Sequence, residues 1–329
     1  MRAAVITRPG GPEVLEIRDV PRPLPREGEV LVKVEASALN RADLLQRLGR
    51  YPAPPGAPSS IPGLEIAGTV FELGDAVTGW REGDRVFGIV GGGANAEFCV
   101  ARARELARVP TGLGWTDAAA VPEAFITAHD AIITLARMRA GEHVLVHAVG
   151  SGVGLAAVQI VRAFEGVCIG TARTEEKLRR ARGLGLAHSI VISDDPSAML
   201  EPVARITDGR GVDVVIELVG GAYLPADISA SAPLGRIVLV GLLAGRSATL
   251  DLGTILNRRI TIRGTALRSR PAVEKADATA AFVREVLPML ERGDVQPIVD
   301  SVLPLERIRE AHELLESNRT FGKVVLTHV

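Results

Sequence analysis

The chain has 329 residues, 47% hydrophobic and 23% charged, a balance typical of folded globular proteins and a length that allows two domains. Its formal net charge of −1 gives no electrostatic basis for binding nucleic acid or an anionic membrane surface, so we expect neither as a partner. No apolar run approaches the ~18 residues that cross a bilayer, and the charged N-terminal region is unlike a signal peptide.

The first ~120 residues predict a β-rich domain, because short alternating apolar runs are separated by glycine and proline. The expected strands lie in residues 13–20, 28–37, 66–74, 84–90 and 96–110. The proline-rich segment 51–63 is expected to run over the surface or to cover a cleft. The polar stretch NRADLLQRLGRYP (40–52) is by itself compatible with a solvated helix or with the wall of an active site.

The pattern changes near residue 120. Residues 116–136 predict a helix, after which apolar strands alternate with helical segments. The expected strands are residues 143–148, 167–172, 189–193, 212–220, 235–241 and 259–265. Strands that are apolar throughout and alternate with helices predict an α/β fold with a parallel, doubly wound sheet of the Rossmann type.

The last part of the chain predicts a short mixed segment. We expect a helix over 272–292, a β-like run over 295–305, a helix over 304–317 and a strand over 322–328. This segment is too small to fold alone, so we expect it to return to the N-terminal domain. The predicted domains are a catalytic domain over 1–122, completed by 266–329, and a Rossmann domain over 123–265.

The most informative segment is HVLVHAVGSGVGLAAVQI (143–160), where a buried strand meets a glycine-rich turn and then a helix. Backbone N–H groups at such a helix N-terminus, together with the helix dipole, can bind a pyrophosphate. The turn reads A-x-x-x-G-V-G rather than G-x-G-x-x-G. Its position between a strand and a helix nevertheless favours a dinucleotide-binding site rather than a turn with only a structural role. The expected binding residues are Ala148, Gly150, Ser151, Gly152, Val153 and Gly154.

The end of the second Rossmann strand, residues 167–172, predicts which dinucleotide binds. An NAD site normally has an acidic residue there, and this chain has none directly at the strand end. Arg173, Lys177 and the Thr174 hydroxyl can instead bind a 2′-phosphate, so we predict NADPH. Glu175 and Glu176 support the alternative, in which these are solvated charges at the start of a helix.

The chain resembles the medium-chain dehydrogenases/reductases, specifically their zinc-free quinone oxidoreductase branch, which includes zeta-crystallin. Within that branch it is most similar to the p53-inducible quinone oxidoreductases. The resemblance runs essentially end to end and is carried by SALNRADLLQRLGRYP, IPGLEIAGTV, AAAVPEAFITA, the A-x-x-x-G-V-G turn and FGKVVL. It implies a GroES-like catalytic domain, a Rossmann domain and an active-site cleft between them.

The zinc ligands of related alcohol dehydrogenases are missing. Those enzymes carry a cysteine at the position of Asn40, and a separate Gly-His-Glu supplies the next ligand. This chain has Leu64 in place of that histidine, and leucine cannot ligate a metal. The only cysteines, Cys99 and Cys168, are far apart, which excludes a cysteine-rich zinc lobe and fits a reducing, cytoplasmic location. We therefore expect no metal, with Glu65 retained as a structural hydrogen-bond acceptor.

The resemblance further implies that residues 40–52 line the cleft, with Asn40, Asp43 and Tyr51 facing the substrate. Without a metal, the expected electron acceptor is a quinone, an ortho-quinone favoured, which takes hydride from NADPH readily. Tyr51 could polarise a carbonyl or deliver a proton, and Asn40 could donate a hydrogen bond to developing negative charge. The alternative for Tyr51 is a packing role in the proline-rich loop. Arg41, Arg47 and Arg50 are compatible with solvent exposure.

Further cofactor contacts implied by the resemblance are Thr127, Gly241, Leu242, Leu267, Ser269 and Lys323. For Lys323, a simple strand-edge charge is equally compatible. Ser193 stands where many relatives carry a tyrosine against the 2′-phosphate, which weakens the NADPH prediction. Relatives are usually dimers, and the apolar runs 236–245 and 259–265 could pair at a sheet edge. Alternative functions are an enone or enoyl reductase acting on an activated C=C bond, and a non-catalytic NADPH-binding or sensing protein.

Overall fold

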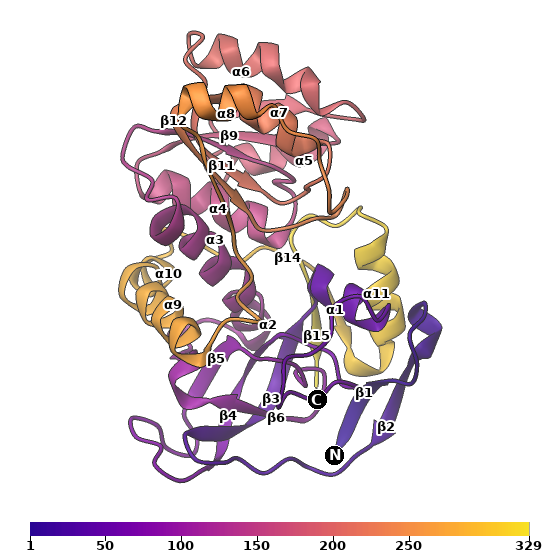
Figure 1. The fold of residues 1–329 in the computed structure, drawn as a ribbon. Coiled ribbons are helices and arrows are strands. Elements are labelled where there is room, and N and C mark those ends of the chain that lie inside the picture. Colours follow the sequence, from indigo (N-terminus) through magenta and orange to yellow (C-terminus); the bar gives the residue numbers. More distant parts are fainter. Residues whose placement is uncertain (329) are drawn as a thin grey trace. The chain divides into compact units, whose positions relative to one another are not determined.

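The computed structural model describes residues 1–328, which form two compact units. One unit comprises residues 1–126 together with 267–328, and the other comprises residues 127–266. The sequence places the corresponding boundaries after residues 122 and 265. Figure 1 shows the beginning and the end of the chain, in indigo and yellow, within the same unit.

The first unit is built on a seven-stranded sheet in which the last strand of the chain, β15, pairs with β3 from its beginning, and β14 pairs with β15. The strand order is β14-β15-β3-β4-β5-β7, and β6 also pairs with β3. These strands are β3 (Glu29–Ala38), β4 (Glu65–Leu73), β5 (Arg85–Ile89), β6 (Phe98–Arg102), β7 (Leu106–Arg108), β14 (Val299–Pro304) and β15 (Lys323–Thr327). Because β15 runs antiparallel to β3, with Val325 opposite Ala38, the C-terminal segment completes this sheet.

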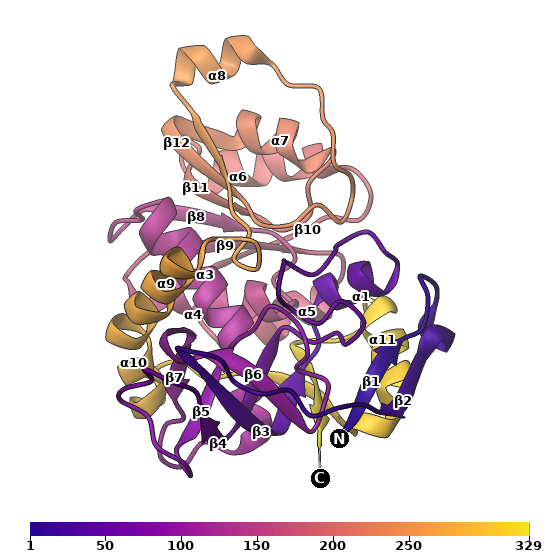
Figure 2. The ribbon, with the colours of Figure 1, turned by 60° about the horizontal axis from the view of Figure 1, so that its bottom comes forward.

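Two hydrophobic clusters hold the first unit together. Alternating valines of β3, such as Val30 and Val32, pack with Ile66 of β4 because successive strand side chains point to opposite faces. A second cluster joins Leu44 of α1 to Ile308 of α11, beside the antiparallel ribbon of β1 and β2, and Figure 2 shows these elements side by side. The other strands and α-helices of this unit are β1 (Arg2–Ile6), β2 (Leu15–Asp19), α1 (Arg41–Arg47), α2 (Trp115–Ala119), α9 (Ala272–Glu285), α10 (Leu287–Arg292) and α11 (Ile308–Glu316).

The second unit is a six-stranded sheet in which every pair of neighbouring strands is parallel. Its strand order is β10-β9-β8-β11-β12-β13, so the chain order reverses between β8 and β11. The strands are β8 (His143–Val146), β9 (Val167–Ala172), β10 (His188–Val191), β11 (Val212–Glu217), β12 (Ser231–Leu239) and β13 (Thr261–Gly264). The helices are α4 (Gly152–Ala163), α5 (Glu175–Arg182), α6 (Leu200–Ile206), α7 (Tyr223–Ala230) and α8 (Leu252–Arg258). This is the doubly wound Rossmann arrangement that the strand–helix alternation predicts.

Several elements differ in detail from the prediction. The strand expected over 235–241 begins earlier, at Ser231, and α8 is an additional helix that starts at the N-cap Asp251. The helix expected over 116–136 is a succession of short segments: α2, a π-helical turn η3 (Pro122–Ile126), α3 (Thr127–His129) and a second π-helical turn η4 (Asp130–Leu135). Pro122 cannot donate a backbone hydrogen bond and therefore interrupts the regular α-helix.

Contrary to the expectation from the sequence, the helical run Trp115–Leu135 is long and apolar enough to cross a membrane, by length and composition alone. However, 78% of its most apolar window is buried inside the protein, as in a core helix, so it is weak evidence for a membrane span.

Candidate active site

The glycine-rich turn lies where β8 ends and α4 begins, at the point of the sheet where the strand order reverses. Ala148 has a positive φ of 48°, a conformation that a non-glycine residue rarely adopts. Ser151 is the N-cap of α4, and its Oγ accepts a hydrogen bond of 3.1 Å from Gly154 N. A Cβ atom on Gly154 would lie 2.5 Å from the carbonyl oxygen of Ala148, so only glycine fits there.

These features fit a bound dinucleotide. Ligands of open α/β sheets bind at the carboxyl ends of the strands where the strand order reverses, and a helix N-terminus there binds phosphate. Gly152 and Val153 form the first turn of α4, whose N–H groups are available to an anion. Nearby in the same unit, Thr127 is buried and its Oγ1 has no hydrogen-bond partner, which leaves a polar atom for a ligand.

The residues predicted to select NADPH lie around the start of α5. Arg173 and Thr174 are exposed, and the aliphatic stem of Lys177 packs on the turn, since a Cβ atom on Gly150 would lie 2.7 Å from Lys177 Cδ. The Glu175 carboxylate pairs with Arg182 of the same helix, with 2.9 Å between Oε1 and the guanidinium. Its charge is therefore not directed at Arg173 and Lys177 alone.

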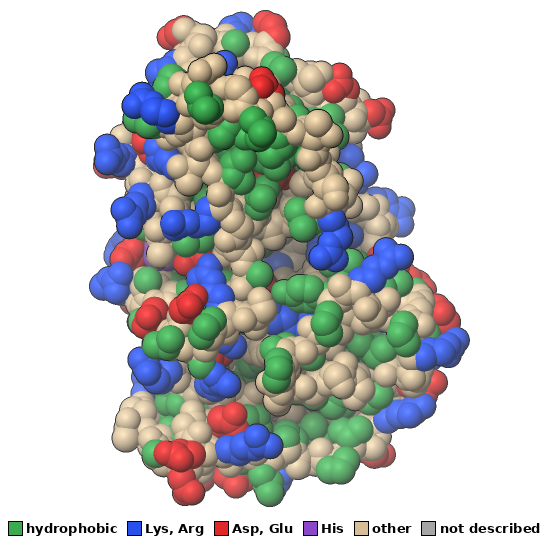
Figure 3. Space-filling view, viewed as in Figure 1, with side chains coloured by type: hydrophobic (Ala, Val, Ile, Leu, Met, Phe, Trp, Pro, Cys, Tyr) green, Lys and Arg blue, Asp and Glu red, His purple; other side chains and the backbone are tan. Residues whose placement is uncertain are grey.

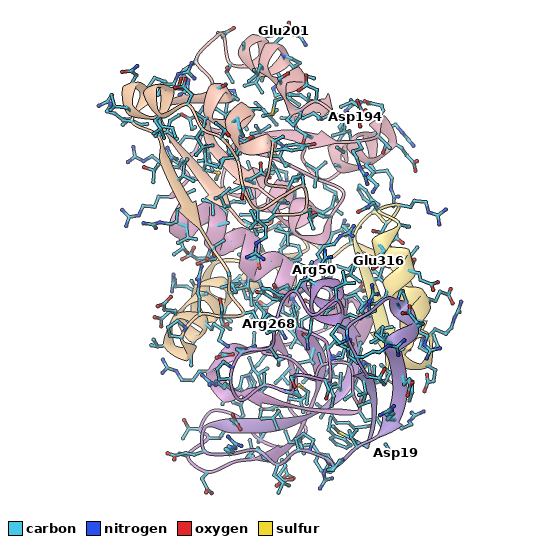
Figure 4. The ribbon with its side chains drawn as sticks, turned by 45° about the vertical axis from the view of Figure 1, so that its right-hand side comes forward. Asp19, Arg50, Asp194, Glu201, Arg268 and Glu316 are labelled. Carbon is cyan, nitrogen blue, oxygen red and sulfur yellow. The ribbon has the colours of Figure 1, made fainter. Side chains whose placement is uncertain are left out.

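The other predicted cofactor residues are placed as follows. Ser193 is exposed after β10, next to Asp194, which Figure 4 shows at the periphery of the second unit. Gly241 follows β12, where a Cβ atom would lie 2.4 Å from the Leu218 carbonyl oxygen, and Leu242 is exposed. Leu267 and Ser269 belong to the first unit; the Leu267 side chain is buried and Ser269 is exposed. Their contacts with a nucleotide stay predictions.

In the first unit, a buried lysine occupies the centre of a polar cluster. Lys323 Nζ donates to Asn40 Oδ1 at 2.6 Å and to the Leu39 carbonyl at 2.8 Å, and it pairs with Glu65 Oε1 at 2.6 Å. Glu65 is completely buried and also accepts hydrogen bonds from Asn40 Nδ2 and Glu123 N, both at 2.8 Å. Glu65 is therefore a structural acceptor, as the sequence suggested.

These contacts correct the predictions for Lys323 and Asn40. An ammonium group has three N–H bonds, and all three of those of Lys323 are used inside the first unit, so Lys323 has none left for a nucleotide phosphate. Asn40 donates to Glu65 and, at 3.3 Å, to the Ala38 carbonyl, so its amide has no donor left for a substrate. Both residues position the cluster.

The same cluster does not fit zinc. Asn40, Leu64 and Glu65 do not offer the sulfur and nitrogen donors of a zinc site, and Lys323 already places a positive charge on Glu65.

Asp43 and Arg47 also differ from their predicted roles. Asp43 is completely buried, and its oxygens accept hydrogen bonds from Asn40 N at 2.7 Å and Gly63 N at 2.8 Å, so it caps α1 and does not face a substrate. Burial raises the pKa of Asp43 to about 6. Arg47 is buried rather than solvated, because it donates to the Gly10 carbonyl and pairs with Glu316 of α11, a residue labelled in Figure 4.

Tyr51 is held by an arginine that the sequence reasoning did not single out. The Arg268 guanidinium lies 5.1 Å from the centre of the Tyr51 ring, in a cation–π arrangement. Arg268 is buried and bonds Gln46 Oε1 at 2.6 Å and the Gly91 carbonyl at 2.9 Å. The Tyr51 ring thus does pack, as the alternative reading proposed, while the residue stays partly exposed. Burial, and next the nearby Glu123 carboxyl, raise the pKa of its hydroxyl.

Glu123 is the second residue that sequence reasoning missed. It is the second residue of the π-helical turn η3, and its Oε2 is shielded from solvent without a hydrogen-bond partner. Burial, and next the negative charge of Glu65, raise its pKa to about 8. The available signal was a single acidic residue within the apolar run AAAVPEAFITA.

A second polar cluster lies in the second unit. His147, Glu217 and Asp227 are the one group of three potential ligands found close enough for a metal ion within residues 1–328. His147 Nε2 lies 2.8 Å from Asp227 Oδ1, and its Nδ1 lies 2.8 Å from Thr171 Oγ1. Burial raises the pKa of Glu217 to about 8 and that of Asp227 to about 7, and Glu217 Oε2 and Asp227 Oδ2 are both buried without a hydrogen-bond partner. Both ring nitrogens of His147 have a partner, so His147 is a satisfied residue directly after β8.

Comparison with known proteins agrees with this architecture. The alcohol dehydrogenase GroES-like domain matches residues 26–111, and the zinc-binding dehydrogenase domain matches residues 152–282. A quinone oxidoreductase of Lama guanicoe is 35% identical over 99% of this chain and 97% of its own. A mycobacterial protein solved in complex with NADPH has a TM-score of 0.89 and 29% identity, with complete coverage of both chains. A structure described as an NAD-dependent alcohol dehydrogenase has a TM-score of 0.86 and 34% identity, also with complete coverage.

The relatives are nicotinamide-dependent oxidoreductases; both domain families occur in this chain, and the relatives match it over nearly its full length. The chain therefore belongs to the medium-chain dehydrogenase/reductase superfamily, is an NAD(P)H-dependent oxidoreductase, and is related within that superfamily to quinone oxidoreductases.

Proposed function

We propose that the protein is a zinc-independent, NADPH-dependent quinone oxidoreductase. The observation that carries this proposal is the position of Lys323, whose ammonium neutralises Glu65 and binds Asn40. In zinc-containing relatives the corresponding segment supplies metal ligands, whereas here it is closed by a buried ion pair. A substrate that needs a metal to polarise its carbonyl is therefore disfavoured.

A quinone can be reduced without a metal. Its reduced product is aromatic, so it accepts hydride with less electrophilic help than a simple ketone needs. NADPH supplies the hydride when bound, and the chain supplies position and electrostatics. Tyr51 is the group best placed to bind a substrate oxygen, because it is partly exposed and its ring is held by Arg268. Asn40 and Asp43 act indirectly, by positioning the Lys323 cluster and the start of α1.

The preference for NADPH rests on the charges at the start of α5. Arg173 is exposed, and the Lys177 stem lies on the glycine-rich turn, so both cations are near the expected adenosine end of the nucleotide. No acidic side chain stands directly at the end of β9 to bind a ribose 2′-hydroxyl.

The test is NADPH oxidation against a panel of ortho- and para-quinones, with EDTA present throughout and NADH run in parallel. We expect turnover that EDTA does not reduce and a lower KM for NADPH than for NADH. Turnover that EDTA abolishes would refute zinc independence, and equal KM values would refute the nucleotide preference.

Two other functions are tested by the same assay. An enone reductase would use the same cofactor and Tyr51 region, and it would be indicated by faster turnover of conjugated enones than of any quinone. A non-catalytic NADPH-binding protein would bind NADPH tightly and reduce neither class of acceptor.

We also propose that the protein is a homodimer. β13 is an edge strand with one unpaired side, and the neighbouring leucines 242, 243, 252 and 256 are exposed. Figure 3 shows hydrophobic side chains gathered on the face that carries α8. A second copy could extend the sheet and cover these leucines. Light scattering should report a dimer, and Leu256→Glu should weaken it, whereas the equally exposed Leu24→Glu in the first unit should not. A wild-type monomer would refute the dimer.

We propose a reducing, cytoplasmic location on the basis of the two cysteines. Cys99 and Cys168 are free, and both are buried away from oxidants.

A further inference from the structure

We propose that Glu123 is the proton donor of quinone reduction and delivers its carboxyl proton to the substrate oxygen that Tyr51 binds. This inference rests on the proposed quinone reductase activity. It adds a catalytic residue that the sequence motifs did not indicate.

The first support is the state of the three buried or half-buried carboxyl groups of this region. Both oxygens of Glu65 are engaged, by Lys323 and Asn40 on one side and by Glu123 N on the other. Both oxygens of Asp43 are engaged by backbone N–H groups. Glu123 alone of the three has an oxygen, Oε2, that is shielded from solvent and has no partner. A carboxyl group in that state is available to a ligand.

The second support is how the chain fixes this side chain. Glu123 follows Pro122 at the start of η3, where backbone N–H groups lack helical acceptors. Its own N–H is bound by the buried Glu65 carboxylate at 2.8 Å, and Glu65 is in turn held by Lys323. The backbone of Glu123 is therefore anchored to the rigid sheet of the first unit, while its carboxyl remains free.

The third support is that the Glu123 carboxyl is a stronger acid than the Tyr51 hydroxyl. The charged groups that face Glu123 come from four elements or loops: Glu65 on β4, Lys323 on β15, Asp43 on α1, and Arg268. Burial and Glu65 outweigh the two cations and raise the pKa of Glu123 to about 8, so the carboxyl holds its proton at neutral pH. The pKa of Tyr51 is raised above its ordinary value of about 10. Glu123 is thus the stronger acid, and Tyr51 is better suited to hold the substrate oxygen.

The proton transfer balances the reaction. Reduction of a quinone to a hydroquinone requires one hydride, carrying two electrons, and one proton. NADPH is the reductant that supplies the hydride. The O–H bond of Glu123 breaks as an O–H bond forms on the quinone oxygen where negative charge develops. The resulting carboxylate regains a proton from water before the next turnover.

The test compares the wild-type protein with Glu123→Gln in single turnovers with saturating NADPH and an ortho-quinone, from pH 6 to pH 9.5. A general acid typically contributes about 10²–10⁴-fold, so we expect a rate loss in that range for the variant at pH 7. The wild-type rate should fall about tenfold per pH unit above pH 8, and the variant rate should not. Glu123→Asp should restore part of the rate. Glu105→Gln is the control, because Glu105 is another buried carboxyl of the same unit with an unpartnered oxygen.

A second readout does not depend on activity. Because the folded-state pKa of Glu123 is raised from 4.5 to about 8, the folded protein binds the extra proton, and stability is lost as pH rises between these values. In the protein without nucleotide, Glu123→Gln should remove this part of the pH dependence of unfolding, whereas Glu105→Gln should retain it.

The outcomes separate the two proposals. Wild-type quinone turnover with an unchanged rate, or an unchanged pH profile, in Glu123→Gln would overturn the proton transfer alone. If Glu123→Gln does not fold, a wild-type rate that stays constant above pH 8 would overturn it. Absence of quinone turnover in the wild-type protein would overturn the proposed function and this inference with it.

Discussion

Replacement of Lys323 by methionine is the sharpest test of the buried cluster in the first unit. Lys323 is 5% exposed, and methionine keeps the length of the side chain while removing its charge and its three hydrogen-bond donors. Glu65, which is completely buried, then keeps only the hydrogen bonds from Asn40 and Glu123 N. We expect the free energy of unfolding to fall by about 3–5 kcal/mol, the usual cost of breaking a buried ion pair by removing one partner.

The chain offers a matched control and a convenient probe. Lys33 pairs with Glu35 at 3.4 Å, but its side chain is 56% exposed, so Lys33→Met should cost about 0–1 kcal/mol. The only tryptophans, Trp80 and Trp115, both belong to the first unit, so tryptophan fluorescence during urea denaturation follows that unit. Unfolding should also be followed by circular dichroism, because a two-unit protein need not unfold in one step.

A double variant separates charge from packing. In Lys323→Met combined with Glu65→Gln, no buried charge is left unpaired, and the Asn40 amide can turn so that its oxygen accepts from the new amide at position 65. The double variant should therefore recover about 2 kcal/mol relative to the sum of the single changes. If Lys323→Met costs no more than Lys33→Met, the reasoning from buried charge is refuted.

Three further predictions follow from other parts of the chain. Gly154→Ala should abolish NADPH binding, measured by fluorescence titration, because the new Cβ meets backbone at 2.5 Å, whereas Gly183→Ala, with its nearest neighbour at 3.5 Å, should bind normally. Arg173→Ala should raise the KM for NADPH about tenfold, which corresponds to the ~1.4 kcal/mol of one charge-assisted contact. The KM for NADH should stay unchanged. Equal changes in the two KM values would contradict the proposed contact with the 2′-phosphate. Burial lowers the pKa of His312 to about 3 and that of His328 to about 4. The same histidines bind a proton near pH 6.5 in the unfolded chain. The free energy of unfolding, measured by tryptophan fluorescence, should therefore fall as the pH drops from 6.5 to 4, and it should fall less steeply in His312→Gln.

The order of elements in the Rossmann unit could be predicted because each strand is buried on both faces and therefore appears as a continuous apolar run. VLV in β8 and VDVVIE in β11 are examples. The ends of elements were less predictable. β12 begins at Ser231, inside a segment that the sequence assigns to a helix and turn, because pairing with β11 extends it. Pairing between strands is a tertiary effect that local sequence does not contain.

The polar stretch 40–52 illustrates the limit for the site. Its residue types indicate an active-site wall, but the structure divides them by neighbours that are distant in sequence. Arg47 is buried by contacts with α11, and Asp43 is used to cap α1. Tyr51 is held by Arg268. Arg268 was not singled out, because in a chain with so many arginines its residue type alone carries little information.

The contact between Lys323 and Asn40 shows why the cluster could not be derived from either segment alone, since 283 residues separate the two in sequence. β15 supplies the cation only because it pairs with β3, whose end leads directly to Asn40. The C-terminal strand therefore has two linked roles: it extends the sheet, and it neutralises the carboxylate of Glu65. Glu65 in turn binds Glu123 N, so the charge at the end of the chain also determines where the proposed proton donor is anchored. On this basis, a change at Lys323 should alter the pH profile of turnover as well as stability, whereas a change at Lys33 should leave the pH profile unaltered and change stability by at most about 1 kcal/mol.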